Sequence, residues 1–308
     1  MRWSKLSLID ATSMNMLTTP TPAPVVYRGT TRHLDLPSCV LTPNDLRRIY
    51  RLLEPKASEA AERQVSSLIL QPGQTQAQLD AIKGQVRAAL KLVIRLQTAS
   101  EWVNGTTIDL LDDEQLPDGI VRIEFDSAFL YRSRANNTQP NNSFSVVVDL
   151  ARPGILDLGN PPTQNASSAN VIGLDATWTN AVYDELAGFF RQRGSKRSWL
   201  HYPRSYDALV LPIGFPLSFD IVYHLDRLIR RAVTLPEALS VALYVYIVLV
   251  VRLLFRIIFN YARWTFPKLE VDAPRQHIAA GHRVAISTLA LIVVGALVKV
   301  ALKMFGVG

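Results

Sequence analysis

Two long hydrophobic segments near the C-terminus constrain this chain more than any other feature. They cover residues 238–259 and 284–305. Each holds about 22 residues, enough for an α-helix to cross a hydrocarbon core of roughly 30 Å at about 1.5 Å per residue. A soluble domain rarely contains two such segments so close together. The sequence therefore predicts an integral membrane protein, with a hairpin of two transmembrane helices at about 238–260 and 284–305 within residues 236–308.

A stripe of polar residues marks the end of the first segment. Its members recur at intervals of four, four and three residues and so share one narrow helical face: Arg252, Arg256, Asn260 and Arg263. Aromatic residues typical of membrane interfaces lie close by: Tyr261, Trp264 and Phe266. If these aromatics mark the membrane edge, Arg252 lies roughly 15–20 Å deeper along the helix axis. An arginine at that depth costs about 2.5 kcal/mol or more unless it snorkels, pairs or faces water.

Three arrangements account for Arg252. The favoured one is a shorter or tilted span that ends near Phe255, from which the basic side chains snorkel to lipid phosphates. The second is a homo-oligomer in which the stripe lines a water-filled lumen. The third is a salt bridge inside the membrane, and it is least favoured because Glu237, Glu270 and Asp272 lie at the opposite end of the span or in the loop after it.

Basic side chains also flank the other ends of the two spans. Lys299 and Lys303 close the second span, while Arg230 and Arg231 precede the first, and all four are expected to snorkel to the interface. In a hairpin of two spans they face the soluble domain, and Arg252 lies toward the opposite side. The charges on the two sides are nearly balanced and do not set the orientation. Because no secretory signal sequence is recognisable, we expect both termini in the cytoplasm and the hairpin in an inner or plasma membrane.

The residues before the hairpin predict a soluble domain and a connecting segment. Residues 1–24 contain a Thr/Pro/Ala-rich stretch and are expected to be disordered, and residues 25–201 form the domain. Residues 202–235 are a juxtamembrane segment. Two prolines and a glycine within residues 209–217 are expected to prevent this segment from spanning as a helix. An amphipathic helix with a basic end follows Pro216 and lies either in the headgroup region or on the domain.

Apolar spacing predicts the elements of the domain. Thr42 is the expected N-cap of a helix that begins at Pro43, and Pro55 is expected to end that helix and start another. Helices are expected at about 43–53, 57–70, 76–97 and 176–192. Strands are expected at 106–111, 120–131 and 143–150. The predicted fold class is α+β, an antiparallel sheet of three to four strands with covering helices, followed by the membrane hairpin.

Charge and composition exclude several classes of function. The net charge is +7, but residues 232–308 hold eight Lys/Arg and three Asp/Glu and so carry most of it. A nucleic-acid-binding domain would concentrate positive charge on the soluble part, so no nucleic acid is expected. Cys39 is the single cysteine, and the five histidines are scattered, so neither a disulfide nor a zinc site is expected. No catalytic or phosphate-binding motif indicates a cofactor, and an enzyme is the less favoured class.

The densest basic cluster of the soluble part lies near its end. It consists of Arg191, Arg193, Lys196 and Arg197, followed by Trp199. Such a cluster can dock on anionic headgroups or on a partner, although a solvated helix end has the same composition.

These observations favour a non-enzymatic sensor or interaction protein tethered to the bilayer. Its expected partners are the lipid bilayer, including anionic lipids, and a protein whose identity the sequence does not give. The main alternative is an oligomeric pore or membrane-disrupting effector that is gated by the soluble domain. A membrane-anchored enzyme has the least support.

Overall fold

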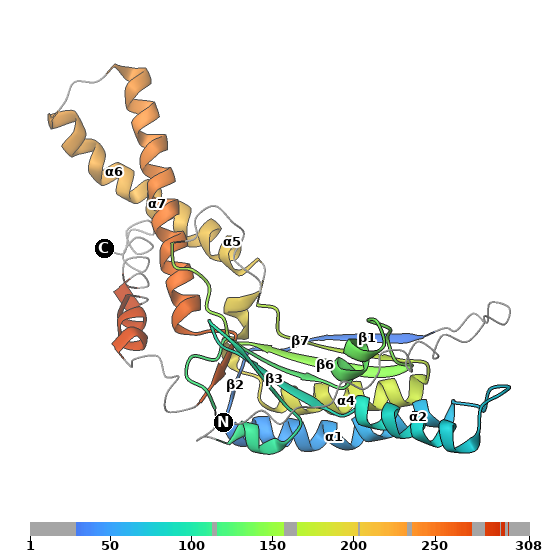
Figure 1. Ribbon diagram of the computed structural model, residues 1–308. Coiled ribbons are helices and arrows are strands. Elements are labelled where there is room, and N and C mark those ends of the chain that lie inside the picture. The colour runs from blue at the N-terminus through green and yellow to red at the C-terminus, as the bar shows by residue number, and fades with distance from the viewer. Residues whose placement is uncertain are drawn as a thin grey trace.

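A computed structural model describes residues 29–112, 116–156, 165–202, 204–232, 236–272, 281–289, 291–292 and 295, with the side chains of 196, 197 and 232 excepted. A layered domain of sheet and helices carries a projecting helical arm at one end (Figure 1). The predicted disordered lead and both lysines of the second span, Lys299 and Lys303, lie outside the described residues.

The central element is a six-stranded, fully antiparallel sheet with the order β1-β7-β6-β5-β3-β4. Its strands are β1 (Thr30–Asp35), β3 (Val93–Gln97), β4 (Trp102–Gly105), β5 (Arg122–Asp126), β6 (Asn142–Asp149) and β7 (Ser168–Gly173). The α+β class and the antiparallel pairing are confirmed, but the expected three to four strands are too few. Among the strands that were missed, β1 is mostly polar and lacks a continuous apolar alternation, whereas β3 was assigned to the preceding helix because its apolar residues continue the helical spacing.

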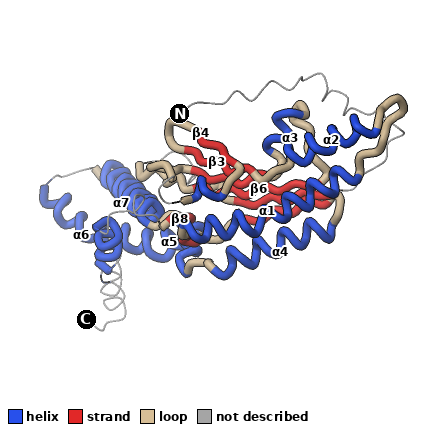
Figure 2. The backbone as a smooth tube through the Cα atoms, turned by 60° about the horizontal axis from the view of Figure 1, so that its bottom comes forward, coloured by secondary structure: helices blue, strands red, loops and turns tan. Residues whose placement is uncertain are grey.

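Helices cover one face of this sheet. Helices α1 (Pro43–Ser66) and α4 (Ala176–Gln192) run side by side across it, with α2 (Gln76–Ala89) next to α1 (Figure 2). The core between the layers is fully apolar at its centre, where Phe125 and Phe144 of the sheet meet Leu46 of α1 and Phe190 of α4 in one buried cluster. Each such side chain stabilises the fold by roughly 1.5–3 kcal/mol through the apolar surface it removes from water.

The first helix confirms one expectation and corrects another. Thr42 caps α1 through a reciprocal capping box with Asp45. The expected break at Pro55 is wrong, because α1 continues through it to Ser66. A proline inside a helix costs about 3 kcal/mol. Burial of the apolar stripe that flanks it, with Leu53 and Ala57 in the core, offsets that cost.

Three other segments change class between sequence and structure. The helix expected at 76–97 ends at Ala89, and residues 93–97 form β3, since pairing with β4 and β5 outweighs the helical spacing. The strand expected at 106–111 is the 3₁₀-helix η2 (Ile108–Leu111). The strand expected at 120–131 is β5 followed by the short helix α3 (Phe129–Arg134). Strand 143–150 and helix 176–192 are confirmed.

The projecting arm begins after the 3₁₀-helix η3 (Lys196–His201). Its outgoing half comprises α5 (Ser205–Leu209), the π-helical turn η4 (Val210–Gly214) and α6 (Phe215–Ala232), and its returning half is α7 (Glu237–Thr265). Two helical stretches, Ser205–Arg231 and Glu237–Thr265, are long and apolar enough to cross a membrane. The expectation that prolines break the first stretch is wrong. The helix continues past Pro212 through the π-helical turn η4, whose wider hydrogen-bond spacing accommodates the missing N–H groups.

The chain returns to the domain after α7. Strand β8 (Leu269–Val271) pairs in parallel with β2 (Cys39–Leu41), and Leu269, Val271, Cys39 and Leu41 all lie in the main core. The sequence expectation that the Arg252 end of the helix points away from the domain is therefore wrong. The pattern of hydrophobic segments gives no sign of this pairing, because β8 is only three residues long.

Candidate functional site at the junction of helix α7 and the domain

The last turns of α7 are fixed to the domain by a buried arginine. Arg263 is only 8% exposed, and its guanidinium donates to the carbonyls of Leu200 at 3.0 Å and Tyr202 at 3.4 Å. The same guanidinium lies over the ring of Phe259, 5.0 Å from its centroid. A buried charge is tolerated only where hydrogen bonds replace the water it has lost. Arg263 therefore holds the helix end against η3.

A histidine and an asparagine add to this attachment. His201 bonds to the carbonyl of Phe266 through Nε2 at 2.9 Å, and buried Asn260 donates to the carbonyl of Ile155 at 3.4 Å. Burial and the neighbouring positive charge of Arg263 lower the pKa of His201 to about 4. The ring is therefore neutral at pH 7, and because a carbonyl only accepts hydrogen bonds, Nε2 carries the proton.

An aromatic cluster lies on the other side of the helix end. Tyr261 and Trp264 are stacked with ring centroids 6.1 Å apart, and the Tyr261 hydroxyl bonds to Nδ1 of His282 at 2.8 Å. Arg152, from the end of β6, lies 5.3 Å from the centroid of Trp264. Tyr261 and Trp264 thus contact the 281–289 helix and the domain. Their expected place at a membrane interface stays a prediction.

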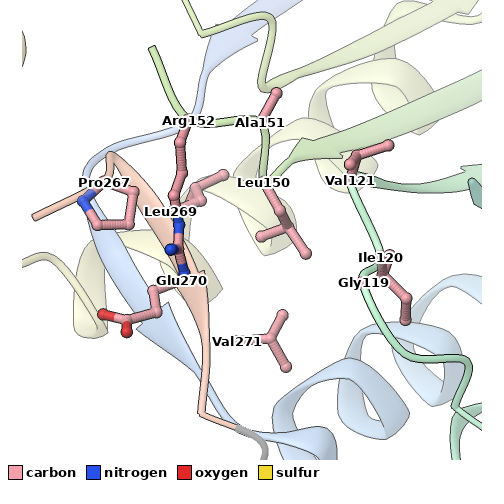
Figure 3. A pocket seen from close by; sticks show the side chains of 10 residues that line it. All are labelled: Gly119, Ile120, Val121, Leu150, Ala151, Arg152, Pro267, Leu269, Glu270 and Val271. Carbon is pink, nitrogen blue, oxygen red and sulfur yellow. The ribbon is translucent and has the colours of Figure 1, made fainter. Parts of the chain in front are cut away.

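A cavity of about 430 Å³ shares Arg152 with this cluster (Figure 3). Its walls come from the segment before β5, the segment after β6 and the chain around β8: Gly119, Ile120, Val121, Leu150, Ala151, Arg152, Pro267, Leu269, Glu270 and Val271. Arg152 extends toward β8 beside Leu269 and Glu270, and the Glu270 carboxylate pairs with Arg283 at 2.5 Å. A mixed apolar and charged wall of this size suits a small molecule or the side chains of a bound peptide.

The structure divides the predicted polar stripe into two parts. Asn260 and Arg263 are buried against the domain, whereas Arg252 is exposed and Arg256 is half-buried. The hydroxyl of Tyr206, in the outgoing half of the arm, donates to the carbonyl of Arg252 at 3.3 Å, so Arg252 lies beside α5. The stripe therefore joins two environments, and only its first half extends beyond the domain.

The predicted basic cluster at residues 191–197 is divided in the same way. Arg191 is exposed, but Arg193 pairs with Asp45 at 2.7 Å and lies over the ring of Phe189 at 3.8 Å. Burial alone would raise the pKa of Asp45, yet hydrogen bonds from Thr42 and the charge of Arg193 bring it below its ordinary value. Arg193 therefore joins the end of α4 to the start of α1. The side chains of Lys196 and Arg197 are outside the description.

The two arginines expected at the start of the membrane region lie at the far end of the arm. Arg230 pairs with Asp226 one turn earlier at 2.8 Å, and Arg231 is exposed. Asp226 also accepts a hydrogen bond from Tyr244 of α7. This polar group links the two halves of the arm near their connection.

One cluster on the uncovered face of the sheet was not singled out from sequence. The guanidinium of Arg95 lies between the rings of Trp102 and Phe129, at 4.3 and 4.4 Å, and pairs with Glu124 at 2.9 Å. The alternation of residues 93–97 is the signal that would have placed Arg95 on a strand, had the helical spacing before it not been extended through them.

Metal chemistry has no candidate in the part of the chain that the structure describes, where no group of three or more His, Cys, Asp or Glu could hold an ion. No family model, curated protein or solved structure matches the chain. Its function therefore has to be inferred from its own geometry.

Proposed function

We propose that this protein is a membrane-tethered sensor or interaction protein whose domain is mechanically joined to helix α7. The observation that carries the proposal is the path of the chain: α7 runs through a short link into β8, and β8 is a strand of the domain itself. A displacement of β8 or of the cavity wall is therefore passed to the helix without a flexible linker.

The outer half of α7 supports attachment to a bilayer. Large apolar side chains on it are more than half exposed, among them Leu239, Val245, Tyr246 and Leu249. Each square ångström of apolar surface left in water costs about 25 cal/mol, so a helix of this composition is stable only when lipid or protein covers it. Lipid is the occupant that matches its length and composition.

The cavity supports a sensing role. It lies between the domain and the segment that continues α7, so a molecule bound there contacts Val121 and Leu150 on one side and Pro267 and Leu269 on the other. A ligand that binds one relative position of the two parts more tightly would bias α7 toward that position, by the difference between its binding free energies for the two positions. The ligand class is a small amphipathic molecule or a peptide side chain.

Membrane fractionation combined with a leakage assay tests this function against the pore alternative. The protein is expected to stay with membranes through washes with high salt and alkaline carbonate, and to release no dye from sealed liposomes after reconstitution. Release into the carbonate supernatant would contradict the tether. Dye release that Arg252→Leu abolishes would instead support the pore alternative.

A further inference from the structure

We propose that the arm is a two-crossing insertion: Ser205–Arg231 carries the chain out across the bilayer and Glu237–Thr265 carries it back, so that Arg231 and Glu237 lie on the face opposite the domain. The partner of both outer surfaces is the acyl-chain region of a lipid bilayer. This inference rests on the proposed membrane attachment, and it specifies how many times and in which direction the arm crosses the bilayer.

Both ends of the arm are attached to the domain. At the outgoing end, Ser205 is buried and its hydroxyl donates to the carbonyl of Trp199. At the returning end, the amide of Asp272 donates to the carbonyl of Leu41 at 2.7 Å, and the amide of Cys39 donates to Lys268 at 3.0 Å. The arm therefore leaves and re-enters on the same side of any membrane that it crosses.

The two halves of the arm run in opposite directions and contact each other at several points, although α6 and α7 splay apart toward their outer ends (Figure 1). Near the domain, the rings of Tyr206 and Phe259 have centroids 5.4 Å apart. Further out, a Cβ at Gly214 would lie 3.7 Å from the ring of Phe255. Near the connection, Asp226 accepts the hydroxyl of Tyr244. Because only a few residues join Ala232 to Glu237, the outgoing half must reach the depth at which α7 begins.

The length and the exposed surface of both halves match a lipid bilayer. Stretches of 27 and 29 residues rise about 40 Å each at roughly 1.5 Å per residue, which exceeds a hydrocarbon core of about 30 Å. Large apolar side chains are exposed on the outgoing half as well as on α7: Leu211, Phe219, Tyr223 and Leu228. Lipid is the partner that covers both halves at once.

Most charged side chains of the arm lie near the ends of its two halves, where two crossings would place them at the lipid headgroups. Asp226, Arg230 and Arg231 all lie within the last two turns of α6, where they reach headgroups on the far side. Arg252 and Arg256 lie at the domain end of the exposed part, which fits snorkelling to the near headgroups. Asp220 lies deeper and is within 3.7 Å of His224 one turn later.

Site-specific labelling in sealed membrane vesicles tests the path. Single cysteines are placed in the full chain at three exposed positions, Asp80→Cys in the domain, Arg231→Cys at the connection and Asp272→Cys after β8. The native Cys39 stays, since it is 1% exposed and burial raises the pKa of its thiol to about 12, and the parent chain measures background. The probe is a membrane-impermeant maleimide, applied before and after permeabilisation.

Two crossings predict that Asp80→Cys and Asp272→Cys react from the same side, and that Arg231→Cys reacts only from the other. A single crossing by α7 predicts that Arg231→Cys reacts from the same side as Asp80→Cys and that Asp272→Cys reacts from the other side. An arm lying in the headgroup plane predicts that all three positions react from the same side. Either of these results overturns the inference. Carbonate extraction of the same samples distinguishes a wrong chain path from a wrong membrane attachment, because an unattached protein leaves the membrane altogether.

Discussion

Arg263 carries a charge in a place where charge is expensive, and its hydrogen bonds explain why it is tolerated. Replacement by leucine leaves the carbonyls of Leu200 and Tyr202 without their donors, at about 1–3 kcal/mol for each buried group. We expect Arg263→Leu to destabilise the domain by about 2–4 kcal/mol, measured as a lower thermal unfolding midpoint in detergent. Arg252→Leu, at an exposed position of the same helix, should change stability by less than about 0.5 kcal/mol. Equal effects would contradict an anchoring role.

His201 makes the junction sensitive to acid. Its folded pKa of about 4 lies below the unfolded value of 6.5, so the unfolded chain takes up a proton first. The stabilisation is therefore complete above about pH 6.5 and is lost as pH falls toward 4, by at most about 3 kcal/mol for this group. His201→Gln keeps a donor for the Phe266 carbonyl without titrating. We expect the unfolding midpoint of His201→Gln to fall less between pH 7 and pH 4.5 than that of the parent chain. If the midpoints of both chains fall equally with pH, His201 is not a source of the acid sensitivity.

Gly173 is fixed by close neighbours on β7. A Cβ at this position would lie 2.4 Å from Oγ1 of Thr179 and 2.7 Å from Oδ1 of Asn142. We expect Gly173→Ala to destabilise the protein by about 1–3 kcal/mol or more, the range for overpacked sites. Gly188→Ala is the matched control, since a Cβ in α4 there has nothing within 4 Å and alanine favours the helix by about 1 kcal/mol. Unfolding curves of the two variants should move in opposite directions.

At the scale of elements, the sequence predicted correctly those helices and strands that residues close together in the chain determine. The cap at Thr42, the helix 176–192 and the strand 143–150 were correct because side-chain spacing or a single hydrogen-bonding residue defines them. Residues 93–97 and the proline-containing stretch 209–217 were wrong because distant partners decide them: neighbouring strands for β3 and α7 for the outgoing helix.

The candidate site was predicted in part only. Arg263 and Asn260 were correctly singled out as unusual polar residues in an apolar helix. The helical spacing shows that they share one face, but it does not show whether that face contacts a water-filled lumen or the surface of the domain. The cavity could not be predicted, since the pairing of β8 with β2 places one of its walls and the sequence gives no sign of that pairing.

That pairing can be tested from the two sides of one small sheet. Val271 in β8 is 2% exposed, whereas Val40 in β2 is 46% exposed. Val271→Asp places a charge in the core and is expected to release β8, which hydrogen exchange would detect as faster exchange in residues 268–272 with α1 and α4 still protected. Val40→Asp should leave exchange in that segment unchanged. If Val271→Asp does not raise exchange there, β8 does not hold the helix.

At the scale of the whole molecule, the arm is an insertion within a domain that β8 completes. Replacing residues 207–257 by a flexible Gly/Ser linker keeps the closely placed Tyr206 and Phe259 and all of β8. We expect this chain to unfold cooperatively. A chain that stops at residue 204 lacks Leu269 and Val271 of the core and should lose several kcal/mol or aggregate. Equal folding of the two chains would show that the domain is complete without β8.

The late position of β8 also sets an order of events during synthesis. Translation delivers β2 among the first structured segments, but its partner is made only after the entire arm. Until then Leu41 and Cys39 lack the strand that pairs with them, and this surface of the nascent chain can be recognised by chaperones. Closure of the small sheet thus follows production of the arm, so a chain whose synthesis stops early keeps an open edge by which quality control can distinguish it.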